Sequence, residues 1–237
     1  MLTPYGKREW LIILVVGGAL IALALYLRWW WAGALVTLAT LALLSFFRDP
    51  PRRVPSGRGL MISPADGVVS SVHAIEHYQP LGESATCIRI FLSVLDVHVN
   101  RSPCDAKVLS LTHKPGKFMN ALNPQSAEVN ESMLIVLASP DDDQAMAAVR
   151  QVSGAIARTI VCRLKVGDQL QRGQRFGMIK FGSTTELYLR QSDAPQVLVH
   201  KGQRVAGGLT VLAKLPVPIE PAAKPGPHQA VETIRPA

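Results

Sequence analysis

Two long uncharged stretches near the N-terminus constrain the fold of this chain more than any other feature. Trp10–Leu27 is 18 residues without a charge, Arg28 interrupts, and Trp29–Phe47 adds 19 more uncharged residues. At about 1.5 Å per residue, a helix over either stretch matches a hydrocarbon layer of about 30 Å. Residues 1–49 are therefore predicted to form a membrane-embedded helical hairpin, with helices over about 10–27 and 29–47.

Charged and aromatic residues indicate how this hairpin is oriented. Arg28 and the three tryptophans at 29–31 lie at the turn, where an aromatic belt is expected. Basic residues flank both outer ends, which predicts that both ends, and the chain after them, face the cytoplasm at the cell membrane. They are Lys7, Arg8, Arg48, Arg52 and Arg53. A hairpin lying partly in one leaflet is the alternative. A cleaved signal peptide fits poorly, because the apolar stretch is too long.

Composition narrows the class of protein. The 237 residues carry a net charge of +8, and charged residues make up 18%, below the usual share of about 25%, which argues against a disordered chain or a coiled coil. Aromatics are 6% and all four tryptophans lie in the apolar stretches, so the basic charge favours an anionic lipid surface over nucleic acid. Three cysteines without a CxxC pair, and the absence of HExxH, predict neither a disulfide framework nor a metal site.

The rest of the chain has the pattern of a β protein. A Pro- and Gly-rich linker covers residues 50–59, and short Val- and Ile-rich runs separated by turn residues fill residues 60–214. We predict a mainly β (α+β) fold, with a barrel-sandwich-like domain behind the α-helical hairpin. Asp142–Arg150 is expected to be a loop or helical turn. Residues 215–237 contain six prolines and no periodicity, and are predicted to be a disordered tail.

Six stretches, taken together and in order, resemble the phosphatidylserine decarboxylase proenzyme family in its short form. They include the runs around Asp66, His98 and Ser183, and cover residues 46–53, 63–69, 90–103, 115–121, 151–158 and 175–184. The resemblance implies pyruvoyl-dependent decarboxylation of phosphatidylserine to phosphatidylethanolamine in phospholipid biosynthesis. A membrane hairpin suits an enzyme that acts on a lipid. The lipid tail, diacyl or archaeal ether, is left open.

The resemblance also implies that the chain cuts itself between Gly182 and Ser183 without using water. Ser183 would become a covalent pyruvoyl group, so no external cofactor is expected. A large chain, residues 1–182, would pair with a small chain, residues 183–237; the residues do not indicate whether a higher oligomer forms. Glycine suits the attacked position because it removes side-chain bulk and permits unusual backbone angles.

Further residues are assigned by the same resemblance. His98 is implied as the base that activates Ser183 or the acid that protonates the product, and Asp66 as the carboxylate that orients it, although Asp66 also suits a turn before Gly67. Arg101 stands where the long bacterial branch has a second histidine, so both proton transfers can fall on His98. A basic turn is implied as a lid over the lipid headgroup, with a solvated loop as the alternative; its residues are His113, Lys114, Lys117 and Phe118.

A second function comes from another class of protein. The turns at Pro64–Gly67 and Val166–Gly173 also resemble those of biotinyl- and lipoyl-type β domains, so a membrane-anchored β adapter without enzymatic activity is the alternative. That function predicts a coiled-coil insertion or a modifiable lysine at a hairpin tip. No heptad run is present, and Lys180 instead stands just before Gly182-Ser183.

Overall fold

The computed structural model describes residues 1–117, 119, 129–140, 143–154, 159–180 and 183–216. Three features predicted from the sequence lie outside these described residues. They are Gly182, Phe118 and nearly all of the expected C-terminal tail, residues 217–237.

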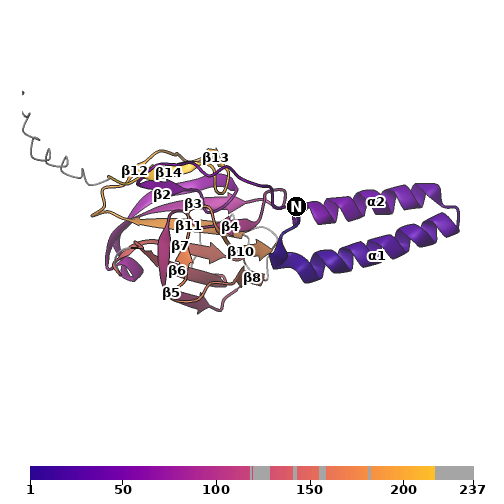
Figure 1. Ribbon diagram of the computed structural model, residues 1–237, viewed down its shortest axis with the longest axis horizontal. Helices are drawn as coiled ribbons and strands as arrows, with labels where there is room; N and C mark the ends of the chain where they lie inside the picture. Colours follow the sequence, from indigo (N-terminus) through magenta and orange to yellow (C-terminus); the bar gives the residue numbers. More distant parts are fainter. Residues whose placement is uncertain (118, 120–128, 141–142, 155–158, 181–182, 217–237) are drawn as a thin grey trace, which may run out of the picture.

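Two helices form a hairpin that projects from a β domain (Figure 1). A short turn, η1 (Pro4–Gly6), leads into α1 (Lys7–Tyr26), and α2 (Trp30–Ser45) runs back beside it. Arg28 makes the reversal with a φ of 60°, a left-handed conformation that is uncommon for a residue other than glycine. The expected helix pair is confirmed, with α1 beginning earlier than the uncharged stretch.

The hairpin is apolar and mostly exposed to its surroundings. Within Pro4–Tyr26, an 18-residue window has a mean hydropathy of 2.2, and this helix is long and apolar enough to cross a membrane. The second helix is equally apolar but shorter. Leucines and tryptophans along both helices, including Trp30 and Trp31, are exposed, so the hairpin lacks the buried stripe of a helix that packs on a soluble core.

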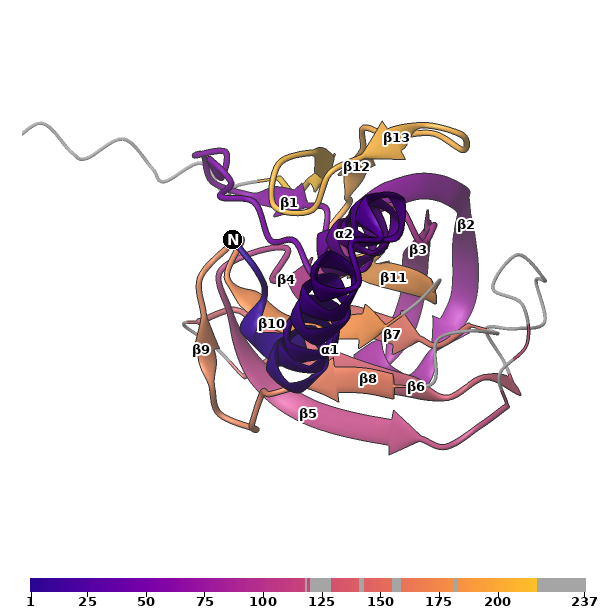
Figure 2. The ribbon, with the colours of Figure 1, turned by 90° about the vertical axis from the view of Figure 1, so that its right-hand side faces the viewer.

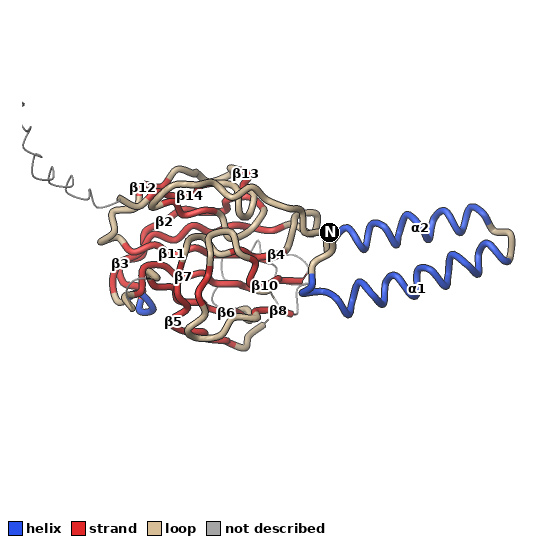
Figure 3. Tube along the Cα trace, in the orientation of Figure 1, coloured by secondary structure: helices blue, strands red, loops and turns tan. Residues whose placement is uncertain are grey.

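A large antiparallel sheet of eight strands forms the body of the β domain, and it curls around its own core (Figures 2 and 3). In order across the sheet, its strands are β13 (Arg204–Val205), β2 (Gly67–Tyr78), β3 (Glu83–Leu92), β11 (Ser183–Arg190), β7 (Ala145–Val152), β6 (Ser132–Ala138), β5 (Ala106–Lys114) and β9 (Gln169–Leu170). A 3₁₀ turn, η2 (Gln79–Leu81), joins β2 to β3.

Two small sheets complete the domain. One contains β4 (Val99–Arg101), β10 (Arg175–Lys180) and β8 (Thr159–Cys162), and the other contains β1 (Leu60–Ile62), β14 (Val211–Lys214) and β12 (Gln196–Val197). The main core consists of aliphatic side chains from the large sheet and from β1 and β14, including Ile88, Ile90, Leu187 and Leu212. The fold class predicted from the sequence, mainly β with an N-terminal helix pair, is confirmed.

One local expectation was wrong. Much of the segment expected to be a loop or helical turn, Asp142–Arg150, is strand β7. Its alanines have weak β propensity, yet Ala147 and Ala148 are fully buried where β7 lies between β6 and β11. Tertiary packing overrides local propensity here.

Gly67 shows how closely the backbones approach where β2 begins. Its φ is 148°, and a Cβ atom at this position would lie 2.1 Å from the carbonyl oxygen of Phe91 on β3. Any side chain would push the two strands apart, so glycine is required directly after Asp66.

Candidate active site

One end of the large sheet gathers almost all of the residues singled out from the sequence. A row of paired residues crosses seven strands there: Arg204, Val68, Phe91, Thr184, Val152, Ser132 and Lys114. Ser183 begins β11 beside this row, Asp66 precedes β2, and the turn that carries His98 follows β3. The topology therefore brings segments far apart in sequence to a single edge.

Ser183 is fully buried at the start of β11, where it pairs with Leu92 of β3. Its hydroxyl oxygen has no hydrogen-bond partner among the described residues. Neighbouring polar atoms are in the same situation: the hydroxyls of Thr184 and Ser153, and the amide oxygen of Gln151. Ser153 lies one position beyond the Thr184–Val152 pair, which places it opposite Ser183 in register.

Unpaired buried polar atoms are costly, and a cluster of them is typical of a site that is built for chemistry. This cluster suits a small electrophilic group carrying a ketone and an amide oxygen, because the Thr184 and Ser153 hydroxyls can donate to such oxygens and the position is buried. The residues present therefore fit a pyruvoyl group at position 183.

A buried amide network links Ser183's strand to the strand that follows His98. Asn100 donates from Nδ2 to Thr185 Oγ1 at 3.1 Å, and its Oδ1 accepts from Gln151 Nε2 at 2.8 Å. His98 and Ser183 each stand two residues before the bonded pair Asn100 and Thr185. Because side chains alternate along extended chain, His98 and Ser183 are on the same sides of their strands as these partners.

His98 is fully buried and its ring lies against Phe46, with centroids 4.3 Å apart. Nδ1 is 2.9 Å from the Asp96 carbonyl oxygen, which can only accept, so Nδ1 carries the proton and Nε2 the lone pair. Burial lowers the pKa of His98 to about 4, outweighing the opposing effects of the Asp96 carbonyl and carboxylate. The imidazole is therefore neutral at physiological pH.

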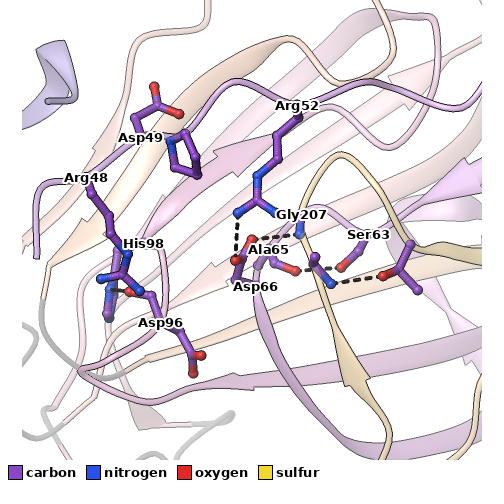
Figure 4. A network of polar contacts seen from close by, with 12 residues as sticks. Arg48, Asp49, Arg52, Ser63, Ala65, Asp66, Asp96, His98 and Gly207 are labelled. Carbon is purple, nitrogen blue, oxygen red and sulfur yellow. Dashed lines mark hydrogen bonds and ion pairs between the residues drawn. The ribbon is translucent and has the colours of Figure 1, made fainter. Parts of the chain in front are cut away.

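Asp66 is held by partners other than His98. Its Oδ2 pairs with Arg52 Nη2 at 2.8 Å, and its Oδ1 accepts from the Gly207 backbone N–H at 2.7 Å. Figure 4 shows the carboxylate turned toward Arg52 and Gly207, while His98 lies beside Arg48 and Asp96. The structure thus brings Asp66 to the same end of the sheet but joins it to an arginine.

The turn that contains Asp66 nevertheless contacts the strand after His98. The Pro64 carbonyl accepts the Arg101 backbone N–H at 2.9 Å and lies 3.4 Å from Asn100 Nδ2. Asp66 therefore connects, through its own turn, to β4.

Arg101 takes part in a buried ion network at the base of the hairpin. Its Nη2 lies 2.7 Å from Asp49 Oδ1, and Arg175 Nε lies 2.7 Å from Asp49 Oδ2. The Asp49 side chain is 2% exposed. Burial lowers the pKa of Arg101, and Asp49 opposes that shift. Arg101, which stands where the long bacterial branch has a second histidine, thus binds the segment that follows the hairpin.

A second ion pair joins the hairpin to the strand that precedes Gly182 and Ser183 in the sequence. Lys180, at the end of β10, lies 2.6 Å from Glu9 of α1. Lys180 is almost buried and lies within a strand, which does not match the exposed hairpin-tip lysine expected of a β adapter.

The described residues of the basic turn, His113, Lys114 and Lys117, are exposed. His113 Nε2 lies 2.9 Å from Glu131 Oε1. Lys114 shares the strand row with Thr184, with two strands between them. At about 4.8 Å per strand, the two backbones are separated by about 14 Å.

Several residues of this site were missed in the sequence. Asn100, Gln151 and Ser153 carry no motif of their own, and their grouping depends on strand pairing. Polar residues inside apolar β-rich runs were the available signal, since such residues are seldom fully buried without a role. Within the described part of the chain, no cluster of three or more His, Cys, Asp or Glu could hold a metal ion.

Comparison with known proteins agrees with this site. The sequence profile described as "Phosphatidylserine decarboxylase" matches residues 40–213. A "Phosphatidylserine decarboxylase proenzyme" of Carboxydothermus hydrogenoformans is 43% identical over 88% of this chain and 95% of its own length. Proteins of the same name from Symbiobacterium thermophilum and Wolbachia pipientis wMel are 43% and 38% identical over 84% and 90% of this chain, and over 92% of their own length. The chain belongs to the phosphatidylserine decarboxylase family.

Proposed function

We propose that this chain decarboxylates phosphatidylserine to phosphatidylethanolamine in phospholipid biosynthesis, after cutting itself between Gly182 and Ser183. The observation that carries the proposal is the buried Ser183 hydroxyl, which has no partner among the described residues and lies amid other unpaired polar atoms. Family membership supplies the reaction class.

Self-cleavage and formation of the pyruvoyl group need only groups of the chain and one water molecule, which enters at the last step. Ser183 Oγ attacks the Gly182 carbonyl carbon, and the peptide bond is exchanged for an ester. Loss of the Cα proton of residue 183 breaks the Cβ–Oγ bond, so Gly182 leaves as a carboxylate that retains this oxygen. Hydrolysis of the remaining enamine releases ammonia and leaves a pyruvoyl group on the small chain, residues 183–237.

His98 is suited to the first proton transfer. Its neutral Nε2 can accept the Ser183 hydroxyl proton, because burial keeps the ring uncharged at physiological pH. The Asp96 carbonyl fixes the tautomer, and Phe46 covers one face of the ring. We assign to the same Nε2 a second proton transfer: it takes a proton from the ammonium group of the substrate as the amine binds, and returns it to the product after carbon dioxide leaves.

Asp66 is proposed as a positioning residue. By binding Arg52 and the Gly207 N–H, it fixes the turn whose Pro64 carbonyl holds β4. This indirect route replaces the direct carboxylate–imidazole contact expected of a Ser-His-Asp arrangement.

The pyruvoyl ketone supplies an electron sink for the decarboxylation. The chain supplies the rest: a dry pocket, Asn100 and Gln151 to fix the strands, and a proton at His98. The exposed basic residues His113, Lys114 and Lys117, with Phe118, are proposed to meet the lipid headgroup. The hairpin would hold this end of the sheet at the membrane surface, on the cytoplasmic side.

An intact-mass spectrum tests the proposal. The purified chain should give residues 1–182 and residues 183–237, the latter lighter by one ammonia than a serine-started fragment. Ser183→Ala should remain one chain and show no decarboxylation of phosphatidylserine vesicles. A wild-type chain that is folded, uncut and inactive would overturn the proposal.

A further inference from the structure

A hollow at the foot of the hairpin is lined by four arginines. Its volume is about 660 Å³, and its wall contains Arg52, Arg101, Arg172 and Arg175, with Tyr5 and Val54. Tyr5 precedes α1 and Val54 follows α2. Neither Ser183 nor His98 belongs to the lining, so the hollow is separate from the reaction centre.

The arginines are only partly neutralised. Asp49 pairs with both Arg101 and Arg175, and Asp66 pairs with Arg52. The Arg172 guanidinium donates to the Gly57 carbonyl at 2.6 Å, while its backbone N–H donates to Asp105. The four arginines of the wall thus face three nearby carboxylates outside the lining, Asp49, Asp66 and Asp105, so the local charge stays positive.

Two arginine donors without a hydrogen-bond partner in the described part of the chain also favour the binding of an anion. The Nε atoms of Arg52 and Arg172 are buried and have no hydrogen-bond partner among the described residues. Arginine donors of this kind match the oxygen atoms of a phosphate group.

The position of the hollow indicates where an anion would come from. If the apolar hairpin occupies the hydrocarbon layer, the residues immediately beyond both helix ends lie at headgroup level. Anionic headgroups concentrate at that level and attract basic residues there.

We propose that this hollow binds the phosphate group of an anionic phospholipid other than the molecule undergoing reaction. The lipid would fix the β domain against the bilayer, with the four arginines around its headgroup. This inference depends on the proposed membrane placement of the hairpin and is independent of the decarboxylation.

Lipid retention measured by native mass spectrometry tests the proposal. The protein is released from nanodiscs that contain phosphatidylcholine and phosphatidylglycerol, which has no serine amine and cannot be a substrate. Wild type should retain phosphatidylglycerol in preference to phosphatidylcholine. Val54→Glu, which adds a carboxylate to the wall without removing a native ion pair, should lower this preference about fivefold.

Matched controls separate charge from shape. Val54→Gln has nearly the same size as Val54→Glu and should retain the preference, as should Lys201→Gln at an exposed turn outside the hollow. Arg172→Gln should lower the preference and Arg172→Lys should largely keep it. Unchanged retention in Val54→Glu, or equal retention of the two lipids by wild type, would overturn the proposal.

Inorganic phosphate distinguishes the two sources of the anion. Inorganic phosphate at the same molar concentration as the lipid headgroups should displace little phosphatidylglycerol, because its acyl chains hold the lipid in the bilayer beside the hollow. Complete displacement would show a site for free phosphate and would also overturn the proposal.

Discussion

His98 lies in an environment that excludes water on most sides, and this decides which chemical step it can perform. A solvent-exposed histidine titrates near 6.5, so it would be partly charged in the cell. Burial against Phe46 lowers the His98 pKa to about 4 and keeps a lone pair on Nε2. A neutral imidazole can accept a proton without first losing one.

The pH dependence of self-cleavage follows from this shift. Because only the neutral ring accepts a proton, the cleavage rate of freshly synthesised chain should stay level from pH 8 to about pH 5.5. It should then fall toward pH 4 as His98 becomes protonated. Gel or mass analysis of cleavage against time gives the profile. His98→Gln should slow cleavage by roughly 100-fold or more between pH 6 and 8, and the difference from wild type should narrow toward pH 4.

Unfolding must be separated from titration in this experiment. The unfolded chain binds a proton at His98 near pH 6.5 and the folded chain only near pH 4, so the free energy of unfolding decreases as the pH falls through this window. Circular dichroism at each pH identifies the folded range. A cleavage midpoint near 6.5 in folded protein would contradict the assignment of His98.

Asp66 and Arg52 should behave as one unit. Asp66→Asn and Arg52→Gln each break the same ion pair, so each should slow cleavage and reduce stability by about 2 kcal/mol. The double variant should be little worse than either single variant, since the shared bond is already lost. Additive effects in cleavage rates would instead show that Asp66 acts on another group, such as His98.

At the scale of elements, the hairpin is fastened to strands β4 and β10, which lie at the same end of the domain as Ser183. Asp49 binds β4 and β10, Glu9 binds the end of β10, and Phe46 covers His98. Thr3 donates its backbone N–H to the Phe47 carbonyl at 2.8 Å, which ties the two feet of the hairpin together. The hairpin and the proposed active site are therefore parts of one packed structure.

The buried Asp49 network and the Glu9–Lys180 ion pair should contribute differently to the free energy of unfolding. Asp49→Asn leaves two arginines facing a neutral side chain in a buried site, and should lower the free energy of unfolding by about 3 kcal/mol. Glu9→Gln should cost less than about 1 kcal/mol, because the Glu9 side chain is 40% exposed. Urea titrations in detergent, followed by far-ultraviolet circular dichroism, would measure the loss of stability in both variants. Tryptophan fluorescence would report only the hairpin, because it contains all four tryptophans. Equal losses would contradict this ranking.

The sequence predicted element types better than it predicted contacts. Hydrophobic runs and turn residues were sufficient for the helix pair and for a β domain. β7 was missed because its alanines resemble a helix or loop until β6 and β11 cover them. The partner of Asp66 could not be read from the sequence, because Arg52 reaches it only after the linker folds back over the domain.

For the whole molecule, the dimensions of the hairpin suggest how it sits in a bilayer. The 20 residues of α1 extend about 30 Å and the 16 residues of α2 about 24 Å, against a hydrocarbon layer of about 30 Å. Tilt or local thinning of the bilayer accommodates a difference of this size. Phe46 and Phe47 are buried at the foot of α2, so under the proposed membrane placement the β domain lies directly against the membrane surface.

A full span places the turn at Arg28–Trp31 on the far side of the membrane. Replacing Trp30 by cysteine, in a chain whose three native cysteines are serine, creates a single thiol at this turn. A membrane-impermeant maleimide should label this variant in intact cells. Lys201→Cys, on the β domain, should be labelled only after lysis, because more basic residues flank the feet of the hairpin than its tip. Labelling of both variants only after lysis would show that the hairpin enters a single leaflet, and labelling of Lys201→Cys in intact cells would reverse the orientation.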